Sequence, residues 1–240
     1  MEKKLSIILP VYNEKESLSV MVRLLNSTLK FENEILIIYD DENDSSVSEA
    51  EILETEFKNV RKFLNTKGKG VMNAVDTGVE KSNYENILIC AVDEIFPIIA
   101  INDMLELLIK NNYDFVSGTR YSKGGKRLGG SLIGSTLSRI ANKLFNYLSD
   151  VPLTDCTTGI KLLKKKVWKS IELESKPIGW AFAFELSIKS YTHGYKLSEF
   201  PLKSVDRLFG GSSTFKPGSW IKEYLRWFWW GLKNAKKYKK

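Results

Sequence analysis

Short apolar runs alternate with segments of helical periodicity along the first half of the chain. In the helical segments apolar residues recur every three or four positions, as at Leu18, Met21 and Leu25, and Asn13 is placed to cap that helix. The repeated strand–helix pattern predicts a mostly parallel sheet with right-handed crossovers and flanking helices. The predicted strands cover residues 5–9, 34–39, 61–64, 86–92 and 113–117.

The second half of the chain is less regular and ends in a segment of different composition. A glycine- and serine-rich loop, residues 206–213, is typical of a segment that closes over a site. Because no internal repeat or low-complexity linker divides the chain, we expect one domain over residues 1–215 and a basic, aromatic tail over 216–240. Helices are predicted over residues 131–148 and 183–191, and a strand over 195–201.

The most informative apolar run ends in two carboxylates, Asp93 and Glu94. An apolar run of this length predicts a strand that is buried on both faces. Ligands bind at the carboxyl ends of the strands in an open α/β sheet, so Asp93 is a candidate site residue. An aspartate here is also a common helix cap, and on this run alone that alternative stays open. The other predicted strands end in polar loops too, and we expect these loops to converge on one edge of the sheet.

Composition excludes several classes of site. Hydrophobic residues make up 43% of the chain and charged residues 27%, as in ordinary soluble domains. Cys90 and Cys156 are too few for a disulfide framework and lack metal-binding spacing, which favours a reducing, cytoplasmic setting. The single histidine, His193, rules out a histidine-rich metal site and argues against a Ser-His-Asp triad.

The formal net charge of +7 is carried by the tail. Residues 216–240 hold eight basic side chains and one acidic side chain, whereas residues 1–215 hold 28 of each sign. In a helix that begins near Trp220, apolar and basic residues fall on different faces, and four of the six tryptophans lie in this segment. Basic residues and tryptophan on an amphipathic helix are typical of an interfacial membrane anchor. A helix docked on its own domain, or in a homo-oligomer interface, is the alternative.

The tail also bears on the choice of partner. None of its apolar runs is long enough to span a bilayer, so we expect it to lie on the membrane surface. A tail that binds an anionic polymer is a further hypothesis. We do not expect a nucleic-acid partner, because no nucleic-acid-binding motif is present and the aromatic content suits a bilayer interface better.

A glycine–lysine loop, Lys67-Gly68-Lys69-Gly70, precedes a predicted helix. It lacks the spacing of a Walker A loop, and the chain has no G-x-G-x-x-G dinucleotide fingerprint. Backbone N–H groups at this helix start, together with Lys69, would suit a diphosphate. The alternative is a plain turn with solvated lysines.

A series of short motifs occurs in order between about Leu5 and Ser213. They are Ile7-Ile8-Leu9-Pro10-Val11-Tyr12-Asn13-Glu14, Asp40-Asp41, Gly118-Thr119-Arg120-Tyr121 with Gly124-Gly125, Ser138-Arg139-x-x-Asn142, Asp155-x-Thr157-x-Gly159, Glu185, Glu199-x-Pro201 and Arg207-x-x-Gly210-x-Ser212. Together they resemble the family 2 glycosyltransferases of the GT-A fold, in the dolichol-phosphate mannosyltransferase-like branch. Each motif alone is weak, whereas their ordered co-occurrence is specific. The resemblance implies an α/β, Rossmann-like fold with a mostly parallel sheet flanked by helices, followed by the C-terminal amphipathic helix.

The resemblance also implies a binding site for a nucleotide-sugar donor such as a UDP- or GDP-sugar. The residues that would hold the base and ribose are Pro10, Tyr12, Glu14 and Asp41. Asp93 matches the second aspartate of the family's Asp-x-Asp motif, which binds Mg²⁺ or Mn²⁺ on the donor diphosphate.

The basic residues of the motifs are implied to meet phosphate groups. Arg120 and Arg139 would meet the acceptor phosphate or the donor diphosphate, for which a guanidinium is well shaped. Arg207 would close over the diphosphate, on a loop that includes Ser212. The residues expected to be catalytic are Asp93, Arg120 and Arg139, and Lys69, Arg207 and Ser212 are expected to bind substrate.

The sequence departs from the family pattern at its metal motif. Ala91 stands where the first aspartate belongs, and Ile95 and Phe96 replace polar residues. Ser213 stands where the family has a lysine. Because Mg²⁺ can rely on one or two carboxylates and substrate phosphates, we expect a weakened metal site rather than none.

For such a chain the resemblance implies inverting sugar transfer to a polyprenyl phosphate or a glycan at the cytoplasmic face of the membrane, in the synthesis of a lipid-linked sugar or a surface polysaccharide. A phosphate acceptor is already anionic, whereas a sugar hydroxyl needs a general base. Glu94, Asp155 and Glu185 are candidates for that base, and Asp155 and Glu185 are equally suited to structural ion pairs. The alternative function is a catalytically impaired GT-A-fold protein that binds nucleotide or acts as a scaffold.

Overall fold

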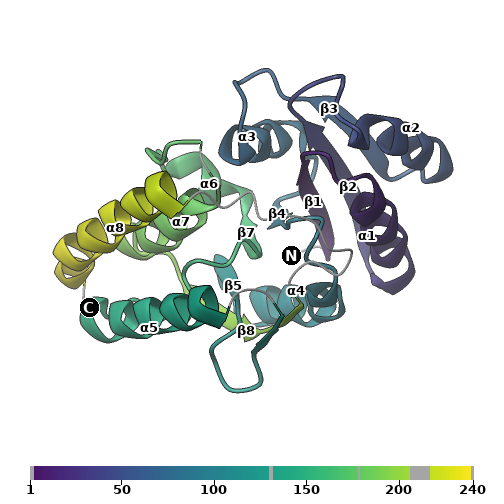
Figure 1. Cartoon of the computed structure of the whole chain (residues 1–240). Coiled ribbons are helices and arrows are strands. Elements are labelled where there is room, and N and C mark those ends of the chain that lie inside the picture. The colour runs from purple at the N-terminus through teal and green to yellow at the C-terminus, as the bar shows by residue number, and fades with distance from the viewer. Residues whose placement is uncertain (1–2, 130–131, 178, 206–216, 239–240) are drawn as a thin grey trace.

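The computed structural model describes residues 3–129, 132–177, 179–205 and 217–238. Within these residues the centre of the molecule is a seven-stranded sheet with the order β3-β2-β1-β4-β7-β5-β8 (Figure 1). All neighbouring strands are parallel except β7, which runs antiparallel to β4 and β5. The strands are β1 (Lys4–Val11), β2 (Glu32–Tyr39), β3 (Val60–Leu64), β4 (Asn86–Ile89), β5 (Phe115–Thr119), β7 (Lys161–Lys164) and β8 (Leu197–Pro201).

Helices cover both faces of this sheet. One face carries α1 (Lys15–Thr28), α2 (Ser46–Glu56), the 3₁₀ helix η1 (Phe96–Ala100) and α4 (Ile101–Lys110). The other face carries α3 (Val71–Lys81), α6 (Lys165–Ser170) and α7 (Ala181–Thr192). Outside α7 lie α5 (Leu132–Ser149), α8 (Pro217–Asn234) and the short η2 (Ala235–Tyr238), on the side of the molecule away from α1 and α2 (Figure 1). A small parallel pair, β6 (Lys126–Leu128) and β9 (Lys203–Val205), lies beside η1.

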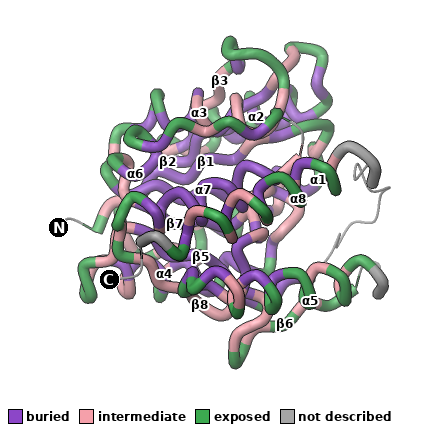
Figure 2. The backbone as a smooth tube through the Cα atoms, turned by 90° about the vertical axis from the view of Figure 1, so that its left-hand side faces the viewer, coloured by how far each residue is buried: buried purple, intermediate pink, exposed green. Residues whose placement is uncertain are grey.

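The alternation of strand side chains divides the core into two layers. Neighbouring strand residues point to opposite faces, so Ile7 packs with α1 and α4 whereas Ile8 packs with α3. All four residues of β4 are buried, as the apolar run predicted, and buried residues line the neighbouring β1 and β7 (Figure 2). The three-layer arrangement and the mostly parallel sheet are therefore confirmed.

The C-terminal helix α8 packs on the body through one side. Trp227 has no exposed surface, and its indole N–H donates to the buried carboxylate of Glu223 at 3.2 Å. Gly231 lies so close to Phe145 of α5 that a Cβ atom there would be 2.6 Å from the ring. The opposite side stays in solvent, with Trp229 66% exposed. In the described part of the chain, no helix combines the length and the apolar character needed to cross a bilayer.

Two local expectations differ from the structure. Asn13 does not cap α1, because its backbone has a φ of 55° and Glu14 takes the N-cap position without a side-chain hydrogen bond. The Asn13 carboxamide instead accepts the backbone N–H of Ser45 at 3.2 Å, which links two loops. Helix α2 was not expected from the sequence, because its apolar residues do not gather on one stripe.

Candidate functional site

The predicted site loops converge on one edge of the sheet. Parallel strands β1, β2, β4 and β5 place their carboxyl ends together, and this is where ligands bind in open α/β sheets. Because β7 runs the opposite way, the loop before it, residues 154–160, reaches the same edge. The turn after β4 lies between the loops of β1 and β2 on one side and those of β5 and β7 on the other.

The loops after β1 and β2 are fastened to each other through Asp44. Its carboxylate accepts the backbone N–H of Asn13, with both oxygens at 3.0 Å, and the Ser46 hydroxyl accepts the N–H of Glu14 at 2.8 Å. Pro10 and Glu14 are half-buried, whereas the Tyr12 ring between them is 67% exposed. The structure therefore brings these three predicted residues together on a braced loop.

The two aspartates that follow β2 have different surroundings. Asp40 accepts the N–H of Gly70 and the amide of Asn65, both at 2.7 Å, and so holds the glycine–lysine loop against β2. Asp41 forms an ion pair with Lys69 at 3.0 Å on the surface. Hydrogen bonds from the Asn43 backbone N–H and from Lys69 lower the pKa of Asp41. The structure thus places Asp41 and Lys69, both predicted as substrate-binding residues, in direct contact.

Glycine is required at the start of α3. Gly70 has a φ of +121°, and a Cβ atom there would lie 2.3 Å from the carbonyl oxygen of Pro177. This close approach brings the segment before α7 against the loop before α3. Helix α3 begins at Val71, two residues after Lys69, so the N–H groups of its first turn follow the Asp41–Lys69 pair directly along the chain.

The turn after β4 carries the candidate metal residue. The strand ends at Ile89, and a tight turn follows in which the Glu94 N–H donates to the Ala91 carbonyl at 3.2 Å. Asp93 and Glu94 are half-buried on this turn, and Glu94 accepts the Ser204 hydroxyl at 3.3 Å. Asp93 does not cap the helix that follows, because Ile95 takes the N-cap position of η1 without a side-chain hydrogen bond. The role of Asp93 in the site stays a prediction.

Arg120 is held by a buried carboxylate. Its Nε and Nη2 donate to the two oxygens of Asp155 at 2.7 and 3.1 Å, and Nη2 also donates to Thr157 at 3.2 Å. Burial raises the pKa of Asp155, but the charge and hydrogen bonds of Arg120, together with the charge of Lys161, outweigh burial and lower the pKa, so the carboxylate stays ionised. No described residue accepts a hydrogen bond from the remaining nitrogen, Nη1. Arg120 is therefore fixed in direction and retains one nitrogen, with two N–H donors, for a ligand.

Helices α5 and α8 adjoin this end of the site. Asn142 of α5 donates to Thr157 and accepts the Cys156 N–H, both at 3.0 Å, and Arg139 is exposed on the same helix. Burial raises the pKa of Tyr224 on α8 to about 12, and the positive charge of Arg120, which is close enough to act on this hydroxyl, partly offsets that rise.

The two remaining predicted residues, Arg207 and Ser212, lie outside the described residues.

The candidate general bases are now distinguishable. Asp155 is fully buried and forms an ion pair with Arg120 at 2.7 Å. Glu185 has no exposed surface, pairs with Lys189 at 2.7 Å and accepts the backbone N–H groups of Glu174 and Ser175. It therefore anchors the segment before α7. Glu94 is the one of the three that is half-buried rather than fully buried, and it lies on the turn after β4.

Sequence reasoning assigned no role to two polar residues behind Arg120, although Glu199 belongs to one of the family-like motifs. Glu199 of β8 is partly buried and accepts the Thr154 backbone N–H at 2.6 Å, and burial raises the pKa of this carboxyl group. Lys161 begins β7 and is fully buried. A lysine set between Ile160 and Leu162 in an apolar run was the available signal.

The donor set fits a divalent cation only weakly. Among the residues that the structure describes, no group of three or more acidic, cysteine or histidine side chains is arranged to hold a metal ion. Asp93 supplies a carboxylate to the turn, whereas Ala91 and Ile95 supply no side-chain oxygen. Mg²⁺ often takes its other ligands from water and phosphate, so these residues suit an ion that arrives with the diphosphate.

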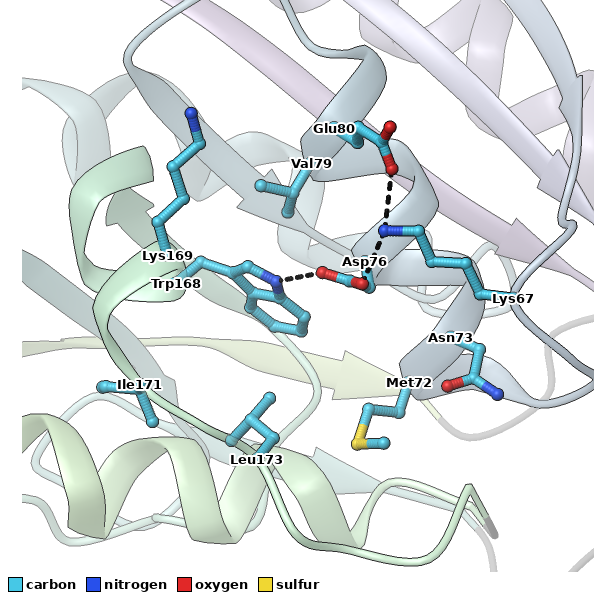
Figure 3. Close-up of a pocket in the computed structure, with 10 residues that line it drawn as sticks. All are labelled: Lys67, Met72, Asn73, Asp76, Val79, Glu80, Trp168, Lys169, Ile171 and Leu173. Carbon is cyan, nitrogen blue, oxygen red and sulfur yellow. Dashed lines mark hydrogen bonds and ion pairs between the residues drawn. The ribbon is translucent and has the colours of Figure 1, made fainter.

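A cavity of about 510 Å³ lies away from this edge, on the outer flank of α3 (Figure 3). Asp76 accepts hydrogen bonds from Lys67 at 2.7 Å and from the Trp168 indole at 2.8 Å, and Lys67 also pairs with Glu80. These groups join α3 to α6. None of the predicted site residues lines the cavity, and we treat it as a surface groove.

Comparison with known proteins identifies the family. The sequence model of glycosyl transferase family 2 matches residues 6–171. A dolichol-phosphate mannosyltransferase of Pyrococcus furiosus is 30% identical over 228 residues, which is 93% of this chain but 62% of the relative. The enzyme of the same name from Mycosarcoma maydis is 26% identical over 208 residues, covering 82% of this chain and 68% of that protein.

Solved structures confirm the fold. Glucosyl-3-phosphoglycerate synthase from Mycobacterium tuberculosis, in complex with Mn²⁺, UDP-glucose and phosphoglyceric acid, superimposes with a TM-score of 0.73. The match covers 96% of this chain and 80% of that one at 12% identity, so it bears on the fold alone. The predicted GT-A fold is therefore confirmed, and the chain belongs to glycosyl transferase family 2.

Proposed function

We propose that this protein is an inverting glycosyltransferase that moves a sugar from a UDP- or GDP-sugar to a polyprenyl-phosphate or glycan acceptor at a membrane surface. One observation carries the proposal: a family 2 chain brings the Asp41–Lys69 pair, Asp93 and Arg120 to a single strand-end edge. Relatives named dolichol-phosphate mannosyltransferase support the lipid-phosphate acceptor. The complex of the structural neighbour with UDP-glucose supports the nucleotide-sugar donor.

The donor is proposed to bind across the loops after β1 and β2. Tyr12 offers an exposed ring to the base, and Glu14 and Asp41 offer oxygens to the ribose hydroxyls. The diphosphate then lies toward Lys69 and the first turn of α3, where backbone N–H groups and the helix dipole favour an anion. Diphosphate binding would draw Lys69 away from Asp41.

The reaction requires stabilisation of the leaving group. An acceptor oxygen attacks the anomeric carbon from the side opposite the diphosphate, a new C–O bond forms, and the bond to the diphosphate oxygen breaks with its electron pair. Negative charge grows on the diphosphate, so cationic groups around it lower the barrier most. When bound through Asp93, Mg²⁺ or Mn²⁺ would supply part of that positive charge.

The acceptor is proposed to lie at the β5 and β7 end of the edge. Arg120 is held by Asp155 so that Nη1 remains for a phosphate, and Arg139 is exposed on the adjoining helix. A lipid phosphate is already anionic and needs no base. If the acceptor is a sugar hydroxyl, Glu94 is our candidate to take its proton.

Helices α5 and α8 supply the proposed membrane surface. Each exposes apolar residues at helical spacing. Exposed stretches run along both helices (Figure 2). The exposed apolar residues are Leu137, Ile140, Leu144 and Tyr147 on α5 and Ile221, Leu225 and Trp229 on α8. Exposed basic residues border them, namely Arg139, Lys143, Lys222 and Lys233. Apolar and basic side chains in this arrangement suit an anionic lipid surface, and α8 also adjoins Arg120.

Release of UDP or GDP tests the catalytic proposal. The purified chain is incubated with UDP- and GDP-sugars, Mn²⁺ or Mg²⁺, and a polyprenyl phosphate in mixed vesicles. We expect nucleotide release that depends on the lipid phosphate and falls at least 100-fold in Asp93→Ala, because the transition-state charge loses its cation. Absence of release with every donor, metal and acceptor would refute the proposal.

A catalytically impaired nucleotide-binding protein is the second candidate. The observation that favours it is Ala91, which removes a carboxylate that the family motif contains. Tight, saturable binding of UDP or GDP without any turnover would support this second candidate over the first.

A further inference from the structure

The buried lysine Lys161 lies behind the Arg120–Asp155 ion pair, and the proposed reaction leaves it without a role. Its backbone pairs with Ile89 of β4 and with Ser117 of β5, so it lies in the middle of the sheet. Its side chain has no exposed surface. Burying an ammonium group costs free energy unless nearby groups offset the lost hydration.

The ammonium group fixes the backbone next to Asp155. Nζ donates to the Ser117 hydroxyl at 2.8 Å and to the Cys156 carbonyl at 3.2 Å. The hydroxyl of Ser187 on α7 donates to the same carbonyl at 3.2 Å. Lys161 therefore ties the loop that carries Asp155 to the sheet, and Ser187 links the same carbonyl to α7.

The charges around Lys161 come from three elements. Arg120 at the end of β5 and Asp155 before β7 neutralise each other, and Glu199 faces the group from β8. Burial raises the pKa of Glu199, which disfavours its ionised form. The uncharged neighbours are the Phe115 ring, 5.6 Å away, and the buried thiol of Cys156, whose pKa burial raises to about 12. Lys161 thus adds a second positive charge to that of Arg120, against the carboxylate of Asp155 and against Glu199, whose ionised form burial disfavours.

We propose that Lys161 is a positioning residue for an anionic acceptor: it holds the Asp155 loop, and its charge lets Arg120 attract a phosphomonoester while Arg120 stays paired. This inference rests on the proposed function, in which the acceptor phosphate meets Arg120. The ammonium does not touch the ligand, because sheet and helix cover it. Its field acts through the protein interior, where charges are screened less than in water.

The pH dependence of ligand binding follows from the burial of Lys161. Burial lowers the pKa of Lys161 to about 8, so its charge is present at neutral pH and is lost as the pH rises through that value. A phosphomonoester keeps its charge over the same range. Affinity for the phosphate should therefore fall above about pH 8, because Lys161 loses its charge while the ligand keeps its own.

Calorimetric binding of farnesyl phosphate, a soluble lipid phosphate, tests the inference in the full chain without turnover. We expect the dissociation constant of the unmodified protein to rise about tenfold between about pH 7 and pH 9.5. Lys161→Met should bind about tenfold more weakly at neutral pH and lose the pH dependence, whereas Lys161→Arg should keep tight binding at high pH. Lys164→Met is the matched control, because Lys164 lies on the same strand but pairs with Asp114 at the opposite edge. This control should behave like the unmodified protein.

The outcomes separate this inference from the proposed function. Turnover together with farnesyl phosphate binding that is unchanged in Lys161→Met would overturn the inference alone. A pH dependence that Lys161→Met abolishes would uphold the inference even if no sugar were transferred. If Lys161→Met does not fold, as judged by its melting curve, the unmodified protein and Lys161→Arg decide, and identical pH profiles for these two would overturn it. No binding by the unmodified protein at neutral pH would overturn it as well.

Discussion

Single side chains set how much negative charge the strand-end edge offers to a cation. Asp93 lies at the turn after β4, and the neighbouring position that could add a second carboxylate is Ala91. A hard divalent cation gains affinity from each added carboxylate oxygen. The strength of the metal site is therefore a property of one residue, which makes it open to a simple test.

Restoring the missing carboxylate should strengthen metal binding. In Ala91→Asp we expect the Mn²⁺ concentration that half-saturates the stabilisation by UDP to fall roughly tenfold, because one charged ligand is added. Thermal unfolding at a series of Mn²⁺ concentrations with saturating UDP measures this. Ala91→Asn is the matched control, since it has a similar shape without the charge. An unchanged Mn²⁺ dependence in Ala91→Asp would mean that the ion does not reach this turn.

The Arg120–Asp155 pair should make stability depend on pH in the acid range. The folded pKa of Asp155 lies below its unfolded value, so the pair stabilises the fold above about pH 4 and loses that contribution as the pH falls through the folded pKa. Asp155→Asn leaves a buried guanidinium without its carboxylate and should cost about 3–5 kcal/mol at neutral pH. The difference in unfolding free energy between the two proteins should then shrink below about pH 4.

Denaturant unfolding at several pH values measures that difference. Asp103→Asn is the control, because Asp103 is an exposed aspartate on α4. A constant difference between Asp155→Asn and the unmodified protein from neutral pH to acid would contradict the assigned protonation state of Asp155.

At the scale of elements, α8 has one buried side and one exposed side, and a different tryptophan lies on each. Trp227 is fully buried, lies 5.1 Å from the Lys189 ammonium group and donates to Glu223. Trp229, two residues on, is 66% exposed. The alternative of a helix docked on its own domain and the membrane-anchor interpretation are therefore compatible, because they concern opposite sides.

Substitution of Trp227 should lower stability, whereas substitution of Trp229 should weaken vesicle binding. Trp227→Ala should lower the free energy of unfolding by about 3–5 kcal/mol, because it leaves a cavity in the core. Trp229→Ala should change that free energy by about 0.5 kcal/mol or less, yet weaken sedimentation with vesicles that contain anionic lipid. Equal vesicle binding by Trp229→Ala and the unmodified protein would remove α8 from the membrane proposal.

The elements that could be predicted from sequence are those with a clear apolar period. The run that became β4 and the stripe of α1 are examples, since their burial follows directly from the spacing. Helix α2 was missed because its apolar residues do not form a stripe. The capping role of Asn13 was wrong because the partner of its side chain, Ser45, lies 32 residues away. The antiparallel direction of β7 likewise depends on contacts that no local pattern contains.

At the scale of the whole molecule, topology made the convergence of the candidate site loops predictable. Parallel strands end at one edge, so the repeated strand–helix pattern was enough to predict that the loops with Asp41, Asp93 and Arg120 converge there. The partner of Arg120 could not, because Asp155 follows 35 residues later on a loop that enters an antiparallel strand. The burial of Lys161 could not be predicted either, because the charged groups around it come from β5, β8 and the loop before β7.

The body should not remain stably folded without α8. Helix α8 covers Phe145 and Phe184, and its residues Glu223 and Arg226 complete an ion-pair network with Glu174 and Lys189 on the body. A chain that ends at residue 215 exposes this apolar surface. It loses at least the roughly 3–5 kcal/mol expected for Trp227 alone, out of a total that is typically about 5–15 kcal/mol.

We therefore expect the shortened chain to aggregate or to unfold without a cooperative transition. Size-exclusion chromatography and a thermal melt followed by circular dichroism measure both properties. The full-length double variant Leu225→Ser, Trp229→Ser is the control, because it removes exposed apolar side chains and leaves the buried face of α8 intact. If the shortened chain is monomeric and melts at the same temperature as the full chain, α8 is an appended tail, and the burial of Trp227 contributes little to the stability of the body.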